Sequence, residues 1–305
     1  MEQIETVGYL DYLIVFESCR SPLGDYYFQN RGGTIRALGI RDQEGVGRGV
    51  LLYERMASQT EILYLSVRDK REGVGTALLT YLVKQEKEKG QTLLFRIQES
   101  GKYSDILKKM AGKQGFSVRD TVELFRSKKE DYPRWQTYMK RHGERILKLL
   151  DTQGFEAVSF LEIPSDVQEE IRNLKHMDFT GELDPVGVMD GRKGHFCKEI
   201  SYISMKDGHP AAYCLVCRPD PLHYVFEIIS AAAKYQDTGV IFQPFAMAVN
   251  KVGEYPYRQV GFAVYQTNKK AIALTGRMMS HLISTRELQY NYIYERIAGG
   301  LNNDD

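Results

Sequence analysis

The chain contains one order of elements twice, and this internal repeat restricts its fold more than any other feature. In the first half Glu61 precedes Gly73 by twelve residues, and in the second half Glu227 precedes Gly239 by twelve. Each stretch reads as Glu-Ile, apolar residues, a polar turn, a glycine and a helix. A hairpin pattern precedes each stretch and a strand pattern follows it, so duplication of one α/β unit explains the match better than chance does.

The elements of the first repeat alternate between strand and helix patterns. Residues 33–40 and 46–54 read as a hairpin around the turn Asp42–Gly45. The following segments read as strand 60–67, helix 73–89, strand 92–98, a short helix ending at Gly115 and a closing strand in VELFR. This order predicts a mixed α/β (α+β) sheet, and residues 1–33 stay ambiguous between helix and buried strand.

The length of 305 residues exceeds that of a usual single domain. We expect an N-terminal domain over residues 1–127, a connecting basic helix over 128–154 and a C-terminal domain over 155–305. The connecting segment contains the only tryptophan, Trp135. Its charge pattern is typical of a solvated helix between domains.

Composition and charge limit the cellular location and the classes of binding partner that we expect. The formal net charge is +1, which gives no reason to expect nucleic acid or a charged membrane as partner. The start, MEQIETVG, has no basic segment followed by an apolar run, and no apolar stretch approaches membrane-spanning length. Four cysteines in so long a chain do not form a disulfide framework, so we expect reduced thiols and a cytoplasmic location.

The stretch KREGVGTALL, from Lys70 to Leu79, places two glycines at the entrance of a helix. The first N–H groups of a helix lack internal partners, and the helix dipole adds positive charge there. Glycine leaves these amides open to a phosphate or pyrophosphate. The stretch is neither the G-x-G-x-x-G fingerprint nor a P-loop.

The segment LSVRDKREGVGTALL resembles motif A of the GNAT acyltransferase superfamily, [QR]-x-x-G-x-[GA] between a strand and a helix. Gly73 and Gly75 occupy the two glycine positions, and Lys70 stands where the pattern has Gln or Arg, which is a mild departure. The later Gly115 and Phe116 match the family's G-F ending. The resemblance implies acetyl-CoA, or another acyl-CoA, as cofactor. It implies that the following residues bind that cofactor: Leu65, Val67, Lys70, Arg71, Glu72, Gly73, Val74, Gly75 and Thr76.

Acyl transfer to an amine requires a base, a donor to the thioester oxygen and an acid for the thiolate. The resemblance suggests Glu61 as the base, and an ordinary strand carboxylate is the alternative. The family's acid, a tyrosine, falls at Ala111 in this chain. Tyr103, at the start of the same helix, is the candidate substitute, and packing is the alternative role for it.

The second repeat departs from the family pattern. Ile241 stands where the second glycine belongs, Pro244 follows in the helix, and Thr275 stands at the tyrosine position. We expect this repeat to have lost the cofactor and to complete the acceptor cleft. Cys214 and Cys217 lie three apart on a strand and therefore on opposite faces, so we expect no metal site.

These features favour a tandem GNAT-like N-acetyltransferase with a small-molecule or peptide amine as acceptor. We expect no nucleic acid and no membrane as partner, and a monomer is compatible because the two lobes can pair internally. One alternative is a non-catalytic acyl-CoA-binding or interaction protein. Another is an aminoacyl transferase that uses charged tRNA, which the near-neutral charge disfavours.

Overall fold

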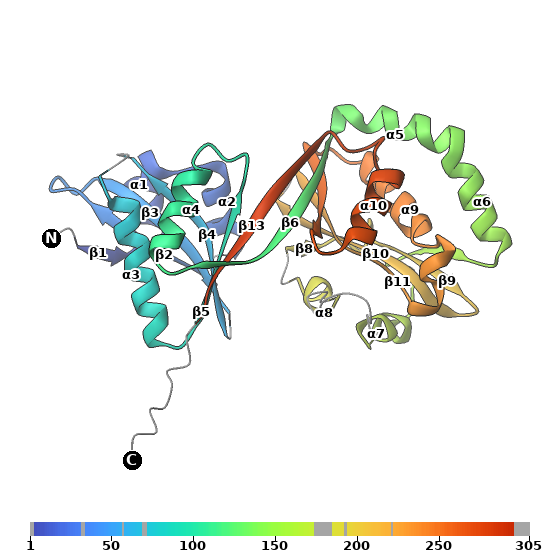
Figure 1. The fold of residues 1–305 in the computed structure, drawn as a ribbon, viewed down its shortest axis with the longest axis horizontal. Helices are drawn as coiled ribbons and strands as arrows, with labels where there is room; N and C mark the ends of the chain where they lie inside the picture. Colours follow the sequence, from blue (N-terminus) through green and yellow to red (C-terminus); the bar gives the residue numbers. More distant parts are fainter. Residues whose placement is uncertain are drawn as a thin grey trace, which may run out of the picture. The chain divides into compact units, whose positions relative to one another are not determined.

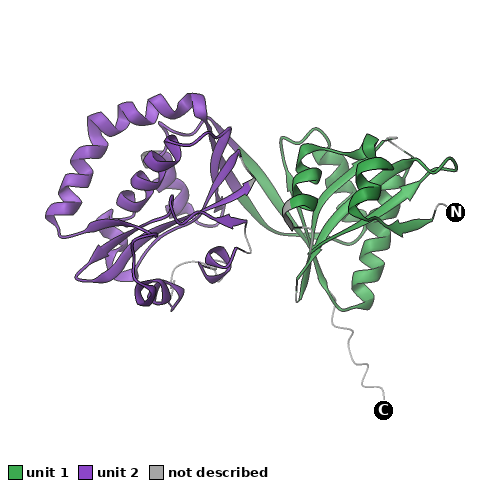
Figure 2. Cartoon of the chain, turned by 180° about the vertical axis from the view of Figure 1, so that it is seen from behind, with its two compact units in different colours: residues 1–122, 287–305 green, residues 123–286 purple. Residues whose placement is uncertain are grey.

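The structure, a computed structural model, describes residues 3–31, 34–56, 58–68, 72–173, 185–191, 194–220 and 222–295. The chain forms two compact units (Figures 1 and 2). Unit 1 contains residues 1–122 and 287–305, and unit 2 contains residues 123–286. Both units combine strands and helices, which confirms the mixed α/β class expected from the sequence.

Unit 1 is a sheet with helices on both faces. Its strands are β1 Ile4–Thr6, β2 Ile35–Arg41, β3 Gly47–Arg55, β4 Gln59–Val67, β5 Thr92–Gln98, β13 Thr285–Tyr294 and β6 Ser117–Lys128, in spatial order. Its helices are α1 Tyr9–Ile14, α2 Pro22–Arg31, α3 Val74–Glu88 and α4 Ser104–Lys113. The ambiguous first 33 residues thus contain a short strand and two helices.

Unit 2 repeats this plan. Its strands follow the spatial order β6, β12 Gln259–Tyr265, β11 His223–Ala231, β10 His209–Asp220, β9 Tyr202–Lys206 and β7 Glu156–Ser159, while β8 His195–Phe196 pairs with β10. Its helices are α5 Tyr132–Tyr138, α6 Glu144–Thr152, α7 Ser165–Asn173, α8 Pro185–Met189, α9 Phe242–Gly253 and α10 Lys269–Met278. A π-helical turn, Met139–Gly143, joins α5 to α6.

The division of the chain differs from the expected domain boundaries of 127, 154 and 305. The last strand, β13, belongs to unit 1 from Glu287 onward, where it pairs antiparallel with β5 from Gln289↔Gln98 to Tyr294↔Leu93. Strand β6 contributes to unit 1 up to Val122 and to unit 2 from Glu123 onward. Strand pairing joins residues far apart in sequence, so the linear order could not reveal that β13 completes the sheet of unit 1.

The expected connecting helix of residues 128–154 is part of unit 2. Trp135 is fully buried in the core of that unit, where its ring meets Phe245 edge-on at 5.8 Å. Its Nε1–H donates to Asn250 Oδ1 at 2.8 Å, which satisfies the polar end of the ring. The charge pattern predicts a solvated linker helix packed between the two lobes, but the apolar side of the segment packs on α9 within unit 2.

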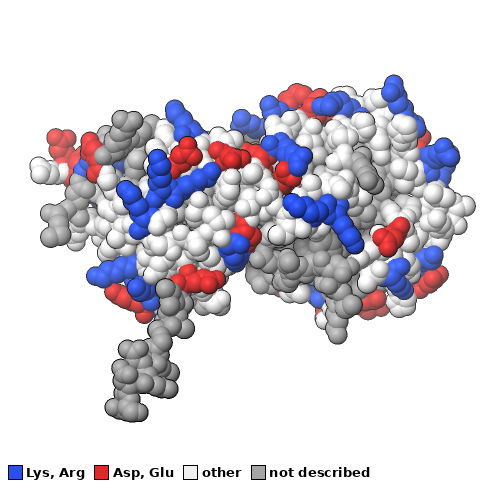
Figure 3. All heavy atoms as spheres, in the orientation of Figure 1, with Lys and Arg blue, Asp and Glu red and all other residues white. Residues whose placement is uncertain are grey.

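An apolar core covers each of the two faces of the unit 1 sheet. One joins α3 and Ala111 of α4 to strand residues such as Leu51 and Phe95. The other joins α1 and α2 to residues on the opposite strand face, among them Ala37 and Leu52. The period-two alternation along β2 and β3 produces this division. Basic and acidic side chains are interspersed on the face in Figure 3, and none of the described helices has the length and hydropathy needed to cross a membrane.

A buried ion pair holds the end of α3 against the sheet. Glu86 has a fully buried side chain, and its Oε2 accepts from Arg55 Nε at 3.1 Å and from Thr60 Oγ1 at 2.7 Å. Lys89 Nζ lies 3.2 Å from Oε1. Burial by itself raises the pKa of the Glu86 carboxyl, but these hydrogen bonds outweigh it and hold the pKa below its ordinary value.

We predict that Glu86→Gln lowers the free energy of unfolding by about 1–3 kcal/mol at neutral pH, because buried donors lose a charged partner. The folded pKa is depressed, so the contribution is complete above the unfolded value of about 4.3 and disappears as the pH falls through the lower folded value. Urea unfolding from pH 7 to pH 3 measures this difference. The exposed Glu88→Gln on the same helix is the control, and equal pH profiles for the two variants would contradict the assignment.

The strand exchange predicts that damage near the end of the chain weakens unit 1. Tyr294 packs on Phe116 at 5.7 Å between ring centroids and belongs to the core beneath α3. Tyr294→Ala should destabilise unit 1 by roughly 1–3 kcal/mol, because a half-buried aromatic ring is lost. Hydrogen exchange should show faster exchange for amides of β5, while amides of β11 keep their protection. Equal acceleration in both strands would argue against separate units.

Candidate active site

A β-bulge interrupts β4 directly before the turn that the sequence singled out. Leu52 of β3 pairs with Tyr64, but the next residue, Tyr53, pairs with Ile62, so Leu63 is the extra residue. The bulge explains why Ile62 and Leu65, three residues apart, both pack on the core beneath α3. Without the bulge, residues three apart would face opposite sides of the sheet.

Beyond the bulge, β4 and β5 separate. Their parallel pairing runs from Gln59↔Thr92 to Ile62↔Phe95, whereas β4 continues to Val67 and β5 to Gln98. Among the described residues, no strand pairs with the β5-facing edge of β4 after Ile62. Leu65 and Val67, which the resemblance assigns to the pantetheine arm, lie in this unpaired part of the strand.

The entrance of α3 presents unused hydrogen-bond donors. Gly73 is its N-cap, with φ of +80°, and makes no side-chain cap. A Cβ built on Gly73 would meet nothing within 4 Å, so the space around it is open. Among the described residues, none accepts a hydrogen bond from the backbone N–H groups of Val74, Gly75 or Thr76. This arrangement suits an anion with several acceptor oxygens.

The second glycine, Gly75, lies next to Val67, in the part of β4 that no longer pairs with β5. A Cβ there would lie 3.4 Å from Met110 Cε and 3.5 Å from Val67 Cγ1, which are ordinary contacts. Gly49 on β3 has a different role, because a Cβ there would approach Val74 within 2.5 Å. Glycine at position 49 therefore allows α3 to begin close to the sheet.

Two arginines flank this entrance. Arg48 of β3 is mostly buried, and its guanidinium pairs with Glu72. Arg68 Nη2 donates to Asp42 Oδ2 at 3.0 Å. The backbone N–H of Val46, more than Arg68, holds the pKa of the Asp42 carboxyl below its ordinary value. The predicted ligand residues Lys70 and Arg71 lie outside the described residues.

Glu61 lies on the strand face opposite Ile62, two residues before the bulge. Its carboxylate is 3.3 Å from Arg96 Nη1, and its side chain is 14% exposed. Glu54 of β3 is its direct antiparallel partner, so two carboxylates face each other across the strands. Like charges in this register are unfavourable, and Arg96 offsets them. Sequence reasoning missed Glu54 and Arg96 because pairing register is not visible in one sequence.

The candidate acid is less well placed. Tyr103 is the N-cap of α4 and is 38% exposed, with Lys102 Nζ 5.7 Å above its ring. Ala111, at the family's tyrosine position, is fully buried in the core and faces away from solvent. The side chain of its neighbour Met110 instead extends to Gly75, next to the unpaired part of β4. No hydrogen bond or ring contact described for unit 1 joins Tyr103 to Glu61, so both roles stay predictions.

Unit 2 repeats the bulge and the strand separation. Leu215 pairs with Ile228 and Val216 with Phe226, so Glu227 is the extra residue on β11. The parallel pairing of β11 with β12 ends at Val225↔Gly261. Glu227 therefore corresponds to Leu63, the bulge residue of unit 1. The sequence match predicts instead that Glu227 corresponds to Glu61, and this part of the match is wrong. The segment from the bulge to the glycine is two residues longer in unit 2.

The helix entrance of unit 2 uses several of its N–H groups within the protein. Gly239 has φ of +77°, like Gly73, but α9 begins three residues later. The N–H of Phe242 donates to Gly239 O and that of Gln243 to Val240 O, each at 3.0 Å. Pro244 has no N–H. The N–H groups of Phe242 and Gln243 are therefore already used within the protein, whereas those of Val74, Gly75 and Thr76 at the start of α3 have no acceptor among the described residues.

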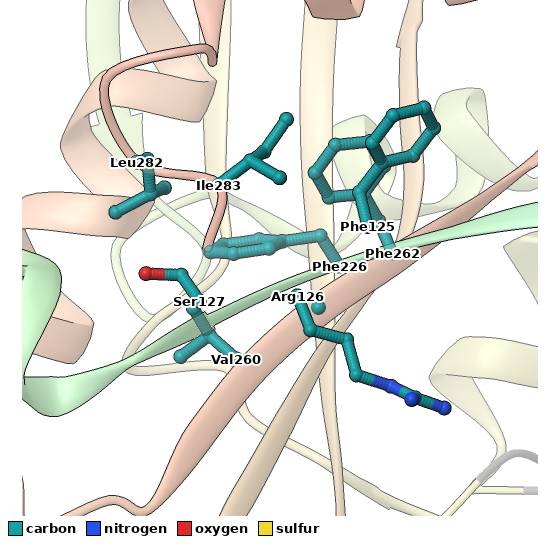
Figure 4. A pocket seen from close by; sticks show the side chains of 9 residues that line it. Phe125, Arg126, Ser127, Phe226, Val260, Phe262, Leu282 and Ile283 are labelled. Atoms are coloured by element: carbon teal, nitrogen blue, oxygen red, sulfur yellow. The ribbon is translucent and has the colours of Figure 1, made fainter. Parts of the chain in front are cut away.

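A small pocket in unit 2 lies where β6, β11 and β12 meet (Figure 4). Its wall is mainly apolar and includes Phe125, Phe226 and Phe262. Phe125 and Phe262 stack with ring centroids 5.1 Å apart. Among the described residues that line it, only Arg126 carries a charge, and its guanidinium points away in Figure 4. The pocket therefore offers no groups for acid–base chemistry.

The four cysteines are buried, and none of them forms a disulfide bond. Cys214 belongs to the core around α9, and Cys217 belongs to the core around α7 and α8. The two thiols thus lie on opposite faces of β10, as their spacing of three predicts. They cannot bind one metal ion together.

Several solved structures have a similar backbone arrangement. A tandem GNAT protein from the clavulanic acid biosynthesis pathway superposes with a TM-score of 0.66 over 96% of this chain and 98% of its own, at 13% identity. A GCN5-related N-acetyltransferase from Sphaerobacter thermophilus gives 0.59 over 85% and 80%, at 14% identity. A glucosamine N-acetyltransferase region of a fungal β-N-acetylglucosaminidase gives 0.70 over 96% of this chain and 38% of that one, at 11% identity.

No family model and no curated protein sequence matches the chain. The similarity is therefore one of backbone arrangement, and it extends over both units. The chain has the tandem GNAT fold.

Proposed function

We propose that the chain is an N-acetyltransferase that transfers an acetyl group from acetyl-CoA, or another acyl-CoA, to an amine. The observation that carries this proposal is the combination of a strand gap after Ile62 with unused amides at the start of α3. A pantetheine arm needs a free strand edge, and a diphosphate needs converging N–H donors. Unit 1 contains both features within one strand–turn–helix segment.

The cofactor residues act mainly through their backbones. The amides from Arg71 to Thr76, with the dipole of α3, hold the diphosphate, and Lys70 and Arg48 add positive charge around it. The free edge of β4 at Leu65 and Val67 pairs with the amide groups of the pantetheine. Acetyl-CoA, when bound, supplies the activated acyl group.

Glu61 is the proposed general base. A carboxylate on β4 near the gap takes a proton from the attacking ammonium, directly or through a water molecule. A backbone N–H of β4 near Val67 donates to the thioester oxygen, which gains charge during attack. Tyr103 is the proposed acid, and a thiolate leaves readily enough for this role to be minor. The amine class, small molecule or peptide, is part of the proposal and rests on the fold alone.

The two units supply a matched test of cofactor binding. Gly73 and Gly239 share a left-handed φ, and a Cβ at either position meets nothing within 4 Å. Aspartate therefore imposes a similar backbone cost of about 1–2 kcal/mol at each position. Only at Gly73 does it place a carboxylate beside free amides. We predict that acetyl-CoA raises the unfolding temperature of the parent and of Gly239→Asp, and fails to raise that of Gly73→Asp.

Calorimetric titration of the parent should give one acetyl-CoA per chain, because Phe242 and Gln243 at the start of α9 already donate within the protein and Pro244 has no N–H. Two equivalent sites would contradict this difference between the units. No protection of the parent at millimolar acetyl-CoA would refute the cofactor assignment altogether. Binding without thiol release over a broad panel of amines would instead favour a non-catalytic acyl-CoA-binding protein.

For catalysis, Glu61→Gln should lower kcat by roughly 10²–10⁴-fold, the usual contribution of a general base, and leave acetyl-CoA affinity nearly unchanged. Thiol release with an accepted amine, measured across pH, tests this expectation. Glu54→Gln is the control, because it removes the facing carboxylate of the same strand pair. Equal losses in the two variants would mean that Glu61 acts through local charge balance and not as the base. Tyr103→Phe should reduce kcat less than tenfold.

A further inference from the structure

Three side chains with metal-binding atoms converge at β8 in unit 2. His195 and Cys197 are two residues apart on extended backbone and therefore share a face. A turn after Cys197 brings Glu199 back to the same place. One ligand atom from each residue lies within 4.8 Å of the other two. Their sequence spacing is not a metal motif, so the sequence had predicted no metal site here.

Backbone hydrogen bonds fix the position of Cys197. Its N–H donates to Val216 O at 2.9 Å, which ties the residue to β10. Its carbonyl oxygen accepts from the N–H groups of Ile200, at 3.1 Å, and Ser201, at 2.9 Å. The Ser201 hydroxyl donates to the same oxygen at 2.8 Å. A ligand held by its own backbone loses little freedom when a metal binds.

The pairing of β8 with β10 orients the other two residues. His195 pairs with Arg218 and Phe196 with Cys217. Phe196 enters the core around α7 and α8, whereas Cys197 enters the core around α9. His195 is exposed and Glu199 is half-buried, so an ion from solvent can reach the cluster from the side of the imidazole.

Glu199 brings a negative charge to the cluster, and Arg218, the strand partner of His195, brings a positive one. The Cys197 thiol donates to the carbonyl oxygen of His195, with Sγ 3.6 Å from that oxygen. A divalent ion compensates the thiolate and the carboxylate together, and the thiol proton leaves to solvent.

We propose that His195, Cys197 and Glu199 bind a zinc ion, with solvent as the fourth ligand. Sulfur, imidazole and carboxylate are all zinc donors, and three protein ligands with one open position form a known class of zinc site. Tetrahedral zinc places its ligand atoms roughly 3.5 Å apart, so the side chains must close by about 1 Å around the ion. This site is independent of the proposed acyl transfer.

Cobalt(II) reports this site directly, because a cobalt–thiolate bond gives a charge-transfer band in the near ultraviolet and tetrahedral cobalt gives visible d–d bands. The full-length protein, first dialysed against a chelator, is titrated with Co²⁺. We expect both bands to saturate at one ion per chain and to disappear when Zn²⁺ is added. Zn²⁺ should also raise the unfolding temperature of unit 2.

Cys197→Ser should abolish the charge-transfer band. The matched control is Cys214→Ser, since Cys214 is equally buried in the same core but far from this cluster in sequence, and it should keep the band. His195→Asn should weaken Co²⁺ binding at least tenfold without changing the unfolding temperature of the metal-free protein. Absence of the band in the parent, or its persistence in Cys197→Ser, would overturn the proposal.

Discussion

The separation of β4 from β5 is the constraint on which the rest of unit 1 depends. It begins at one extra residue, Leu63, which bends β4 and turns Leu65 and Val67 toward the core beneath α3. The strand ends at Val67, and Gly73 then starts α3 without a side-chain cap. An unpaired strand edge and uncapped amides both leave backbone groups available for hydrogen bonds to a ligand. Here they occur next to each other.

Unit 2 keeps the bulge and the strand separation but uses the N–H groups of Phe242 and Gln243 within the protein. Its chain needs two more residues to reach Gly239, and the first N–H groups of α9 donate to carbonyls of that same turn. Pro244 removes a further donor and is tolerated in the first helical turn. The buried Gln243 side chain then fixes the start of α9 by donating to Asp151 and accepting from Ser204. Hydrogen bonds within the protein thus occupy the place of the ligand contacts proposed for unit 1.

Unit 1 is built from two segments of the chain, and the whole of unit 2 lies between them in sequence. The sheet of unit 1 is completed by Glu287–Tyr294, which follow the whole of unit 2 in sequence. Asn291 of this strand is buried, and its side chain donates to Asp120 of β6. Unit 1 therefore reaches its full sheet only after the last strand has been synthesised, and its folding involves contacts of very long sequence separation.

The sequence by itself determined the order of strands and helices in the first repeat after residue 33, the duplication and the glycine turn, because these depend on local periodicity and on backbone preferences. It also showed that Cys214 and Cys217 face opposite sides, since the pleat alternates with a period of two. The tertiary structure alone decided the partner of β13, the burial of Trp135 and the meeting of Glu61 with Glu54 and Arg96. It also decided that Ala111 is buried while Met110 reaches the gap, and that His195, Cys197 and Glu199 converge. Register, bulges and turns set these contacts, and they arise from pairing between segments that the linear pattern does not connect.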